Sequence, residues 1–232
     1  MPPKTPFTNL RHYLRTILRW LSVQTAYRLY NRKISRNQWK DPASIHTYQT
    51  MMQWTWKETS IKAPSYFRRL TGSIDKTHGK VLEIGCGIGT MTRWIAQRES
   101  VSRVWAADCF PECLSLLSDY RLEKVTPWLL DMDNPSLPPH TFDCVVVCEV
   151  LEHLYPDEEI RLLHILHKHI KPDSHYVVSV PIGTLMDPCH VRIFTRRTFH
   201  RHLRRHWGIP EGTDYRSGYS QVAWGQFNTR GT

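Results

Sequence analysis

The residues best suited to chemistry lie in the stretch CEVLEH, residues 148–153, which follows an apolar run typical of a buried strand. Glu149, Glu152 and His153 bring two carboxylates and an imidazole within five positions. If a helical turn begins at Glu149, Glu152 and His153 lie three and four residues further on and share its face. His190 is a fourth candidate, because the loop after the next predicted strand emerges at the same edge of a parallel sheet.

Three roles are open for this group. As a metal site, it would suit Mg²⁺ or Mn²⁺ through its carboxylates, and its imidazoles shift the preference toward Mn²⁺ or Zn²⁺. Such a metal would lower the pKa of an accepting hydroxyl. Without a metal, His153 or His190 would act as general base, and Glu149 would contact cofactor or substrate. In a structural role, Glu152 would favour a helix N-terminus and His153 would pack internally.

A second chemical feature is the glycine turn VLEIGCGIGT, residues 81–90. Gly85, Gly87 and Gly89 lie where a predicted strand passes into a predicted helix, and Glu83 precedes them. Glycine there permits positive φ and lets a ligand approach the backbone. The spacing is G-x-G-x-G, which differs from the G-x-G-x-x-G of dinucleotide-binding proteins.

Acidic residues follow at the ends of the next two predicted strands. Asp108 closes the second strand, and a carboxylate there can accept both hydroxyls of a ribose. Asp131 closes the third strand. Open α/β sheets bind ligands at this carboxyl edge, so these side chains are candidates for one nucleoside site.

Alternating strand and helix patterns from residue 80 onward must position these residues. Strands are predicted at 80–85, 102–108, 125–131, 142–150 and 175–181, and helices at 90–98, 111–123, 157–170 and 195–207. This order predicts an α/β fold: a Rossmann-like, doubly wound, mostly parallel sheet with helices on both faces and an N-terminal helical extension. One short strand is expected near 219–226.

The positive charge of the chain is concentrated at its beginning. The net charge is +10, and residues 1–80 hold 15 Lys or Arg against 3 Asp or Glu. We therefore expect a basic extension over residues 1–75 and the main domain over 76–232. Residues 7–30 predict an amphipathic basic helix that packs on the core, lies on an anionic membrane surface, or serves as an organelle-targeting presequence. The sequence shows no secretory signal and no apolar run of about 20 residues. We therefore expect a cytoplasmic protein, and the basic helix leaves peripheral membrane binding and organelle targeting open.

The six cysteines form no C-x-x-C pair, which excludes zinc-ribbon and thioredoxin-like sites. They are expected to be free thiols in a reducing compartment.

Together the stretches VLEIGCGIGT, AADCF, LLDMDNPSLP and FDCVVVCEVLEHL resemble the class I S-adenosylmethionine-dependent methyltransferases over about residues 78–200. The resemblance implies S-adenosylmethionine as cofactor. It also implies a set of cofactor-binding residues: Glu83, Gly85, Cys86, Gly87, Gly89, Asp108, Asp131, Met132 and Glu149. This fold usually ends in an antiparallel hairpin, and about 25 residues remain after the last predicted helix. We therefore expect an incomplete or rearranged substrate-facing end.

Within that class, the E-x-x-E-H motif is similar to ubiquinone-biosynthesis O-methyltransferases and to small-RNA 3′-terminal 2′-O-methyltransferases. The stretch HVRIFT, residues 190–195, best resembles bacterial methyltransferases acting on glycans or small metabolites. These similarities imply methyl transfer to a small molecule or glycan, at oxygen, with His153 and His190 as catalytic residues. They also imply a candidate Mg²⁺ or Mn²⁺ site of Glu149, Glu152, His153 and His190. The alternatives are an RNA 2′-O-methyltransferase with a divalent metal and a non-catalytic, membrane-associated protein.

The predicted helix 195–207 carries many arginines and histidines. It would bind phosphates of nucleic acid or glycan, face a membrane, or present a solvated surface with Phe199 and Leu203 packed inward.

Overall fold

The computed structural model describes residues 73–183, 190–215 and 220–227. Residues 1–72 lie outside the described part, so the predicted basic helix, the boundary at residue 75 and the localisation stay predictions. None of the helices in the described ranges has the length and apolarity needed to cross a membrane.

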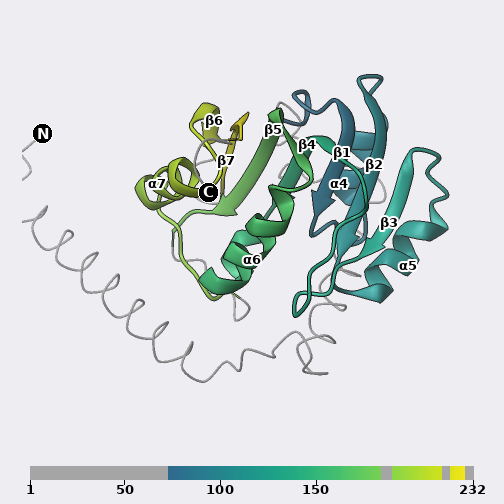
Figure 1. The fold of residues 1–232 in the computed structure, drawn as a ribbon, viewed down its shortest axis with the longest axis horizontal. Coiled ribbons are helices and arrows are strands. Elements are labelled where there is room, and N and C mark those ends of the chain that lie inside the picture. Colours follow the sequence, from purple (N-terminus) through teal and green to yellow (C-terminus); the bar gives the residue numbers. More distant parts are fainter. Residues whose placement is uncertain (1–72, 184–189, 216–219, 228–232) are drawn as a thin grey trace, which may run out of the picture. The chain divides into compact units, whose positions relative to one another are not determined.

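Strands and helices alternate as the sequence predicts (Figure 1). The strands are β1 (Gly79–Ile84), β2 (Val101–Asp108), β3 (Val125–Leu129), β4 (Phe142–Cys148), β5 (Ile170–Pro181), β6 (Pro210–Tyr215) and β7 (Ser220–Gln226). The helices are α4 (Thr90–Ala96), α5 (Pro111–Asp119), the short 3₁₀ helix η2 (Leu151–His153), α6 (Pro156–Leu166) and α7 (Arg196–His206).

The strands form a seven-stranded sheet in the order β3-β2-β1-β4-β5-β7-β6. β7 runs antiparallel to both of its neighbours, and the other pairings are parallel. The predicted Rossmann-like fold is therefore confirmed. The expectation of an incomplete C-terminal end is wrong, because β6 and β7 pair as a full hairpin beside β5.

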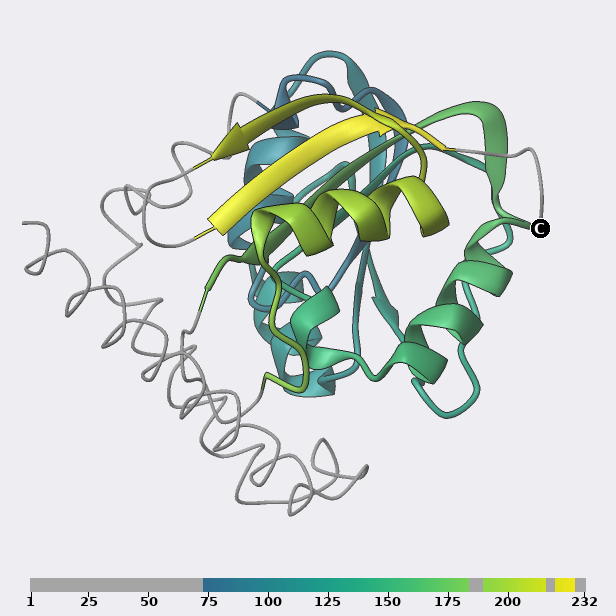
Figure 2. The ribbon, with the colours of Figure 1, turned by 90° about the vertical axis from the view of Figure 1, so that its left-hand side faces the viewer.

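Two apolar layers cover the sheet because alternate side chains of buried strands point to opposite faces. Leu82, Val145 and Val178 belong to the core that also contains α6 and α7 residues. Val81 and Val146 belong to the other core, which contains Met91 and Ile95 of α4. Figure 2 shows α6 and α7 together on the same side of the sheet.

Candidate active site at the carboxyl edge of the sheet

The parallel register brings the ends of neighbouring strands to one edge. Ile84 of β1 lies beside Ala107 of β2 and beside Val147 of β4, which in turn pairs with Val178 of β5. The segments that follow these strands therefore start at the same level of the sheet. This edge holds the predicted glycine turn, Asp108 and the CEVLEH stretch.

The glycine turn is tied directly to Asp108. The amide of Gly87 donates to Asp108 Oδ2 at 2.7 Å, and the amide of Phe110 donates to Oδ1 at 3.0 Å. The carboxyl is 4% exposed, and burial raises its pKa although these amide hydrogen bonds oppose the effect. The structure thus brings the acidic end of β2 against the bend after β1, as the sequence predicts.

Gly85 shows why the turn requires glycine. Its φ is +75°, and a Cβ there would lie 2.3 Å from Val150 Cγ2. A larger residue would be strained in its backbone and would also displace Val150. The turn between β1 and α4 is therefore fixed by the segment that follows β4.

Glu83 lies under this turn and is 3% exposed. Burial raises its pKa to about 8, against the effect of the nearby Thr92 hydroxyl and with added repulsion from Asp108. Its Oε2 has no hydrogen-bond partner among the described residues. A buried acceptor of this kind is completed by a donor such as an ammonium group.

The other predicted cofactor residues differ in exposure. Asp131 is exposed and accepts the amide of Asp133 at 2.9 Å, whereas Met132 is half-buried and packs against the larger core. Cys86 is buried, and burial raises the pKa of its thiol. The described cysteines are free thiols, in line with the sequence prediction.

Glu149 takes a different conformation from the helical turn expected of it. Its φ is +56°, in the left-handed region, and its carboxylate Oε1 accepts the hydroxyl of Ser179 at 2.7 Å. The helical segment begins only at Leu151 and is a 3₁₀ turn. The spacing of three and four residues therefore does not place Glu149 on one helix face with Glu152 and His153.

Three of the four predicted metal-binding residues do come together. Glu152, His153 and His190 each offer a ligand atom, and these atoms lie within 4.8 Å of one another. His153 Nε2 is 3.7 Å from Glu152 Oε1, and the two imidazole rings meet edge to face with centroids 4.8 Å apart. We call these three residues the Glu-His-His cluster.

Backbone hydrogen bonds next to His190 hold this residue in the cluster. The amides of Val191 and Arg192 both donate to the carbonyl of Glu152, at 2.8 and 3.1 Å. The Arg192 guanidinium also donates to the carbonyl of Leu151, through Nε at 3.0 Å and through Nη2. The segment after β5 is thereby fastened to η2.

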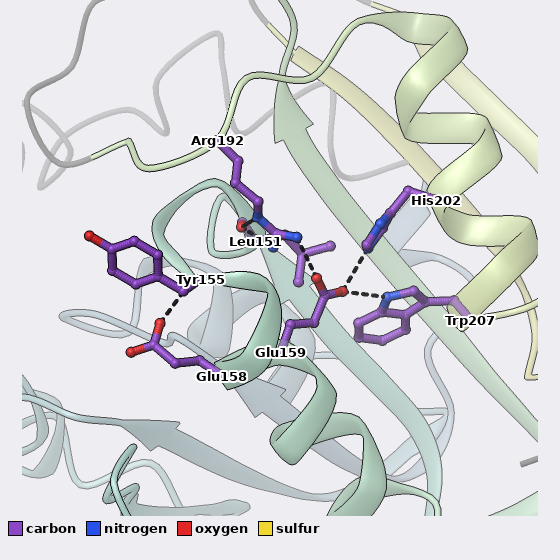
Figure 3. A network of polar contacts seen from close by, with 7 residues as sticks. All are labelled: Leu151, Tyr155, Glu158, Glu159, Arg192, His202 and Trp207. Atoms are coloured by element: carbon purple, nitrogen blue, oxygen red, sulfur yellow. Dashed lines mark hydrogen bonds and ion pairs between the residues drawn. The ribbon is translucent and has the colours of Figure 1, made fainter. Parts of the chain in front are cut away.

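A buried carboxylate completes the fastening (Figure 3). Glu159 of α6 accepts Arg192 Nη1 at 2.6 Å, His202 Nε2 at 2.7 Å and Trp207 Nε1 at 3.2 Å. Although burial alone would raise its pKa, hydrogen bonding and charge from His202 and Arg192 lower the pKa of Glu159 to about 2. Sequence reasoning assigned no role to Glu159, because its partners lie 33 to 48 residues further along the chain.

Comparison with known proteins agrees with this architecture. A family profile described as "Methyltransferase domain" matches residues 55–220, beginning inside the predicted extension. Curated protein sequences give no significant match.

Several solved structures share the fold. The DhpI-SAM-HEP complex has a TM-score of 0.63 at 17% identity, covering 83% of this chain and 99% of its own. A TehB-like SAM-dependent methyltransferase from Corynebacterium glutamicum has a TM-score of 0.61 at 17% identity, with coverages of 81% and 100%. The glycopeptide N-methyltransferase MtfA, complexed with S-adenosyl-L-homocysteine, has a TM-score of 0.56 at 13% identity, with coverages of 68% and 85%. At these identities the similarity shows the fold alone.

Proposed function

The chain belongs to the methyltransferase-domain family, and we propose that it transfers a methyl group from S-adenosylmethionine to a hydroxyl of a small molecule or glycan. The observation that carries the cofactor assignment is the hydrogen bond between the Gly87 amide and Asp108, together with the unpartnered Oε2 of Glu83 on the strand that leads into the same turn. The two features lie at the edge where open α/β sheets bind ligands.

The residues at this edge fit the chemistry of the cofactor. S-adenosylmethionine, when bound, supplies a methyl group activated by a positively charged sulfur. The ammonium of its methionine part suits Glu83, whose buried Oε2 lacks a donor. Each oxygen of Asp108 accepts one backbone amide and keeps a further lone pair for a ribose hydroxyl. Asp131 and Met132 would flank the adenine, and Glu149 would contact the cofactor or the substrate.

The Glu-His-His cluster supplies the base for the acceptor. A hydroxyl becomes a better nucleophile when its proton is removed as the new bond forms. His153 or His190 accepts that proton, and the Glu152 carboxylate beside His153 stabilises the resulting positive charge. General base catalysis of this kind contributes about 10²- to 10⁴-fold to a rate.

A metal-dependent form of the same reaction is the second candidate. Two imidazoles and one carboxylate whose ligand atoms lie within 4.8 Å favour a transition metal such as Mn²⁺ over Mg²⁺. The metal would be held by Glu152, His153 and His190. It would supply Lewis acidity toward the acceptor oxygen.

Cofactor binding is tested by calorimetry with S-adenosylhomocysteine. The wild-type protein is expected to bind, and Asp108→Ala is expected to weaken binding at least tenfold, since it removes the ribose acceptor. Glu112→Gln, an exposed change on α5, is the matched control and should leave the affinity unchanged. No measurable affinity in the wild-type protein would reject the proposal.

The acceptor is tested with labelled cofactor against glycans, quinol precursors and small RNA. We expect transfer to a hydroxyl of the first two classes. At least one of the variants His153→Ala and His190→Ala should have a kcat lowered about 10²-fold or more. Both variants should keep their affinity for S-adenosylhomocysteine. Full turnover in both variants would remove the cluster from the mechanism.

A further inference from the structure

Helix α7 presents a dense array of positive charge to solvent. Its exposed side chains include all five of its arginines, namely Arg196, Arg197, Arg201, Arg204 and Arg205. Phe199 and Leu203 are fully buried and mark the face that packs on the core. At about 100° per residue, the last four arginines centre on the direction opposite to that face. They form one outward stripe, which we call the arginine stripe.

The N-terminal part of the stripe works against the stability of its own helix. Arg197 and Arg201, and then Arg201 and Arg205, are like charges one turn apart. The first turn of α7 contains no acidic residue, and Arg197 lies at the end where the helix dipole disfavours positive charge. An array of negative charge laid along α7 would relieve both effects.

Neighbouring side chains indicate what kind of anion fits. Ile209 lies three residues beyond the end of α7 and is 71% exposed, so an apolar side chain is open to solvent close to the helix in the sequence. Phe199 and Trp207 are buried, so neither of these large rings is open to stack on unpaired bases. Glu211 and Asp214 on β6 are exposed and limit the basic area on that side.

Clusters of four or more Lys or Arg on one exposed face are typical of surfaces that bind anionic lipid headgroups. We propose that α7 is a docking surface for an anionic phospholipid membrane. The arginine stripe contacts lipid phosphates, and Ile209 enters the interfacial region. The docking involves none of the Glu-His-His cluster, so it stands independently of the reaction proposed above.

The test is vesicle flotation of the full chain. Vesicles of phosphatidylcholine alone are compared with vesicles that also contain ~30% of the anionic lipid phosphatidylglycerol. The variant is Arg197→Gln/Arg201→Gln/Arg204→Gln. The matched control, Lys76→Gln/Arg103→Gln/Lys168→Gln, loses the same charge at exposed positions outside α7.

The wild-type protein is expected to float with anionic vesicles only. Each cation near the surface contributes about fivefold to partitioning, so the stripe variant, which lacks three, should partition about 100-fold less onto anionic vesicles. The control variant, whose three changes are scattered outside α7, should partition less than about threefold more weakly than the wild-type protein. Three Arg→Lys changes at the stripe should keep binding, and Ile209→Ser should weaken it about fivefold. The melting temperature of each variant shows that it is folded.

Three results would overturn the proposal. One is equal loss in the stripe variant and the scattered control, because that is a response to net charge alone. Another is unchanged flotation of the stripe variant. The third is binding of the wild-type protein to a short single-stranded RNA, lost in the stripe variant, without any binding to vesicles.

Discussion

Glu159 offers the sharpest test of how the site is held together. It is a carboxylate with a 3% exposed side chain that joins α6 to Arg192, and through the hydrogen bonds of Arg192 to the segment carrying His190 (Figure 3). The change Glu159→Gln keeps the size of the side chain and removes the charge. It leaves the Arg192 guanidinium in a half-buried place without its carboxylate.

The expected loss of unfolding free energy in Glu159→Gln follows from the pKa of the Glu159 carboxyl. The pKa is about 2 against an ordinary value of 4.5, and one pKa unit corresponds to about 1.4 kcal/mol. The charged form therefore stabilises the fold by about 3 kcal/mol. This agrees with the cost of about 3–5 kcal/mol for breaking a buried ion pair by removing one partner.

The assay is urea unfolding of wild-type and Glu159→Gln protein at several pH values. Because the folded-state pKa is lowered, the contribution is fully present above about pH 4.5 and is lost as the pH falls toward 2. The difference in unfolding free energy should be about 3 kcal/mol at pH 7 and clearly smaller at pH 3.

Glu158→Gln is the matched control on the same helix. Glu158 accepts a backbone amide, that of Tyr155, at 2.7 Å, and a glutamine can keep this bond. Its replacement should cost about 1 kcal/mol or less. A Glu159→Gln effect no larger than that of Glu158→Gln, or one independent of pH between 7 and 3, would refute the reasoning.

Three further predictions concern the edge of the sheet. Burial raises the pKa of Glu83 to about 8, so the ligand-free protein should lose stability as the pH rises from about 4.5 through 8. Glu83→Gln should make the melting temperature depend less on pH and should weaken the binding of S-adenosylhomocysteine. An unchanged dependence of the melting temperature on pH would contradict this prediction. Gly85→Ala should lower unfolding free energy by about 1–3 kcal/mol, because of its positive φ and the clash with Val150; denaturant unfolding measures this, and a neutral effect would be unexpected. Mn²⁺ titration followed by electron paramagnetic resonance should show binding that both Glu152→Gln and His190→Ala weaken at least tenfold; binding that survives both changes would reject the metal candidate.

Local patterns in the sequence were enough to predict the glycine turn and the position of Asp108 beside it. Strand, glycine turn and helix follow one another within residues 79–96, and Asp108 ends the next strand. Parallel pairing of neighbouring strands then requires these residues to share an edge. The hydrogen bond from Gly87 to Asp108 joins residues that this topology already brings together.

Features that depend on tertiary context were beyond such reasoning. β6 has the sequence PEGTDY, whose proline, glycine and aspartate disfavour strands, and it forms because β7 offers a partner. Glu149 adopts a left-handed conformation that nothing in its local pattern indicates. The side-chain contacts of Glu159 span 33 or more residues, so no spacing rule finds them.

The strand order also separates the candidate site residues into two groups along the edge of the sheet. The turn after β1 and the ends of β2 and β3 lie on one side of the β1–β4 junction, and the segments after β4 and β5 lie on the other. Under the proposed function, donor recognition rests on the first side apart from Glu149, and acceptor recognition rests on the second side. Sequence drift in the later stretch could thus redirect the enzyme to new acceptors while its methyl donor stays the same.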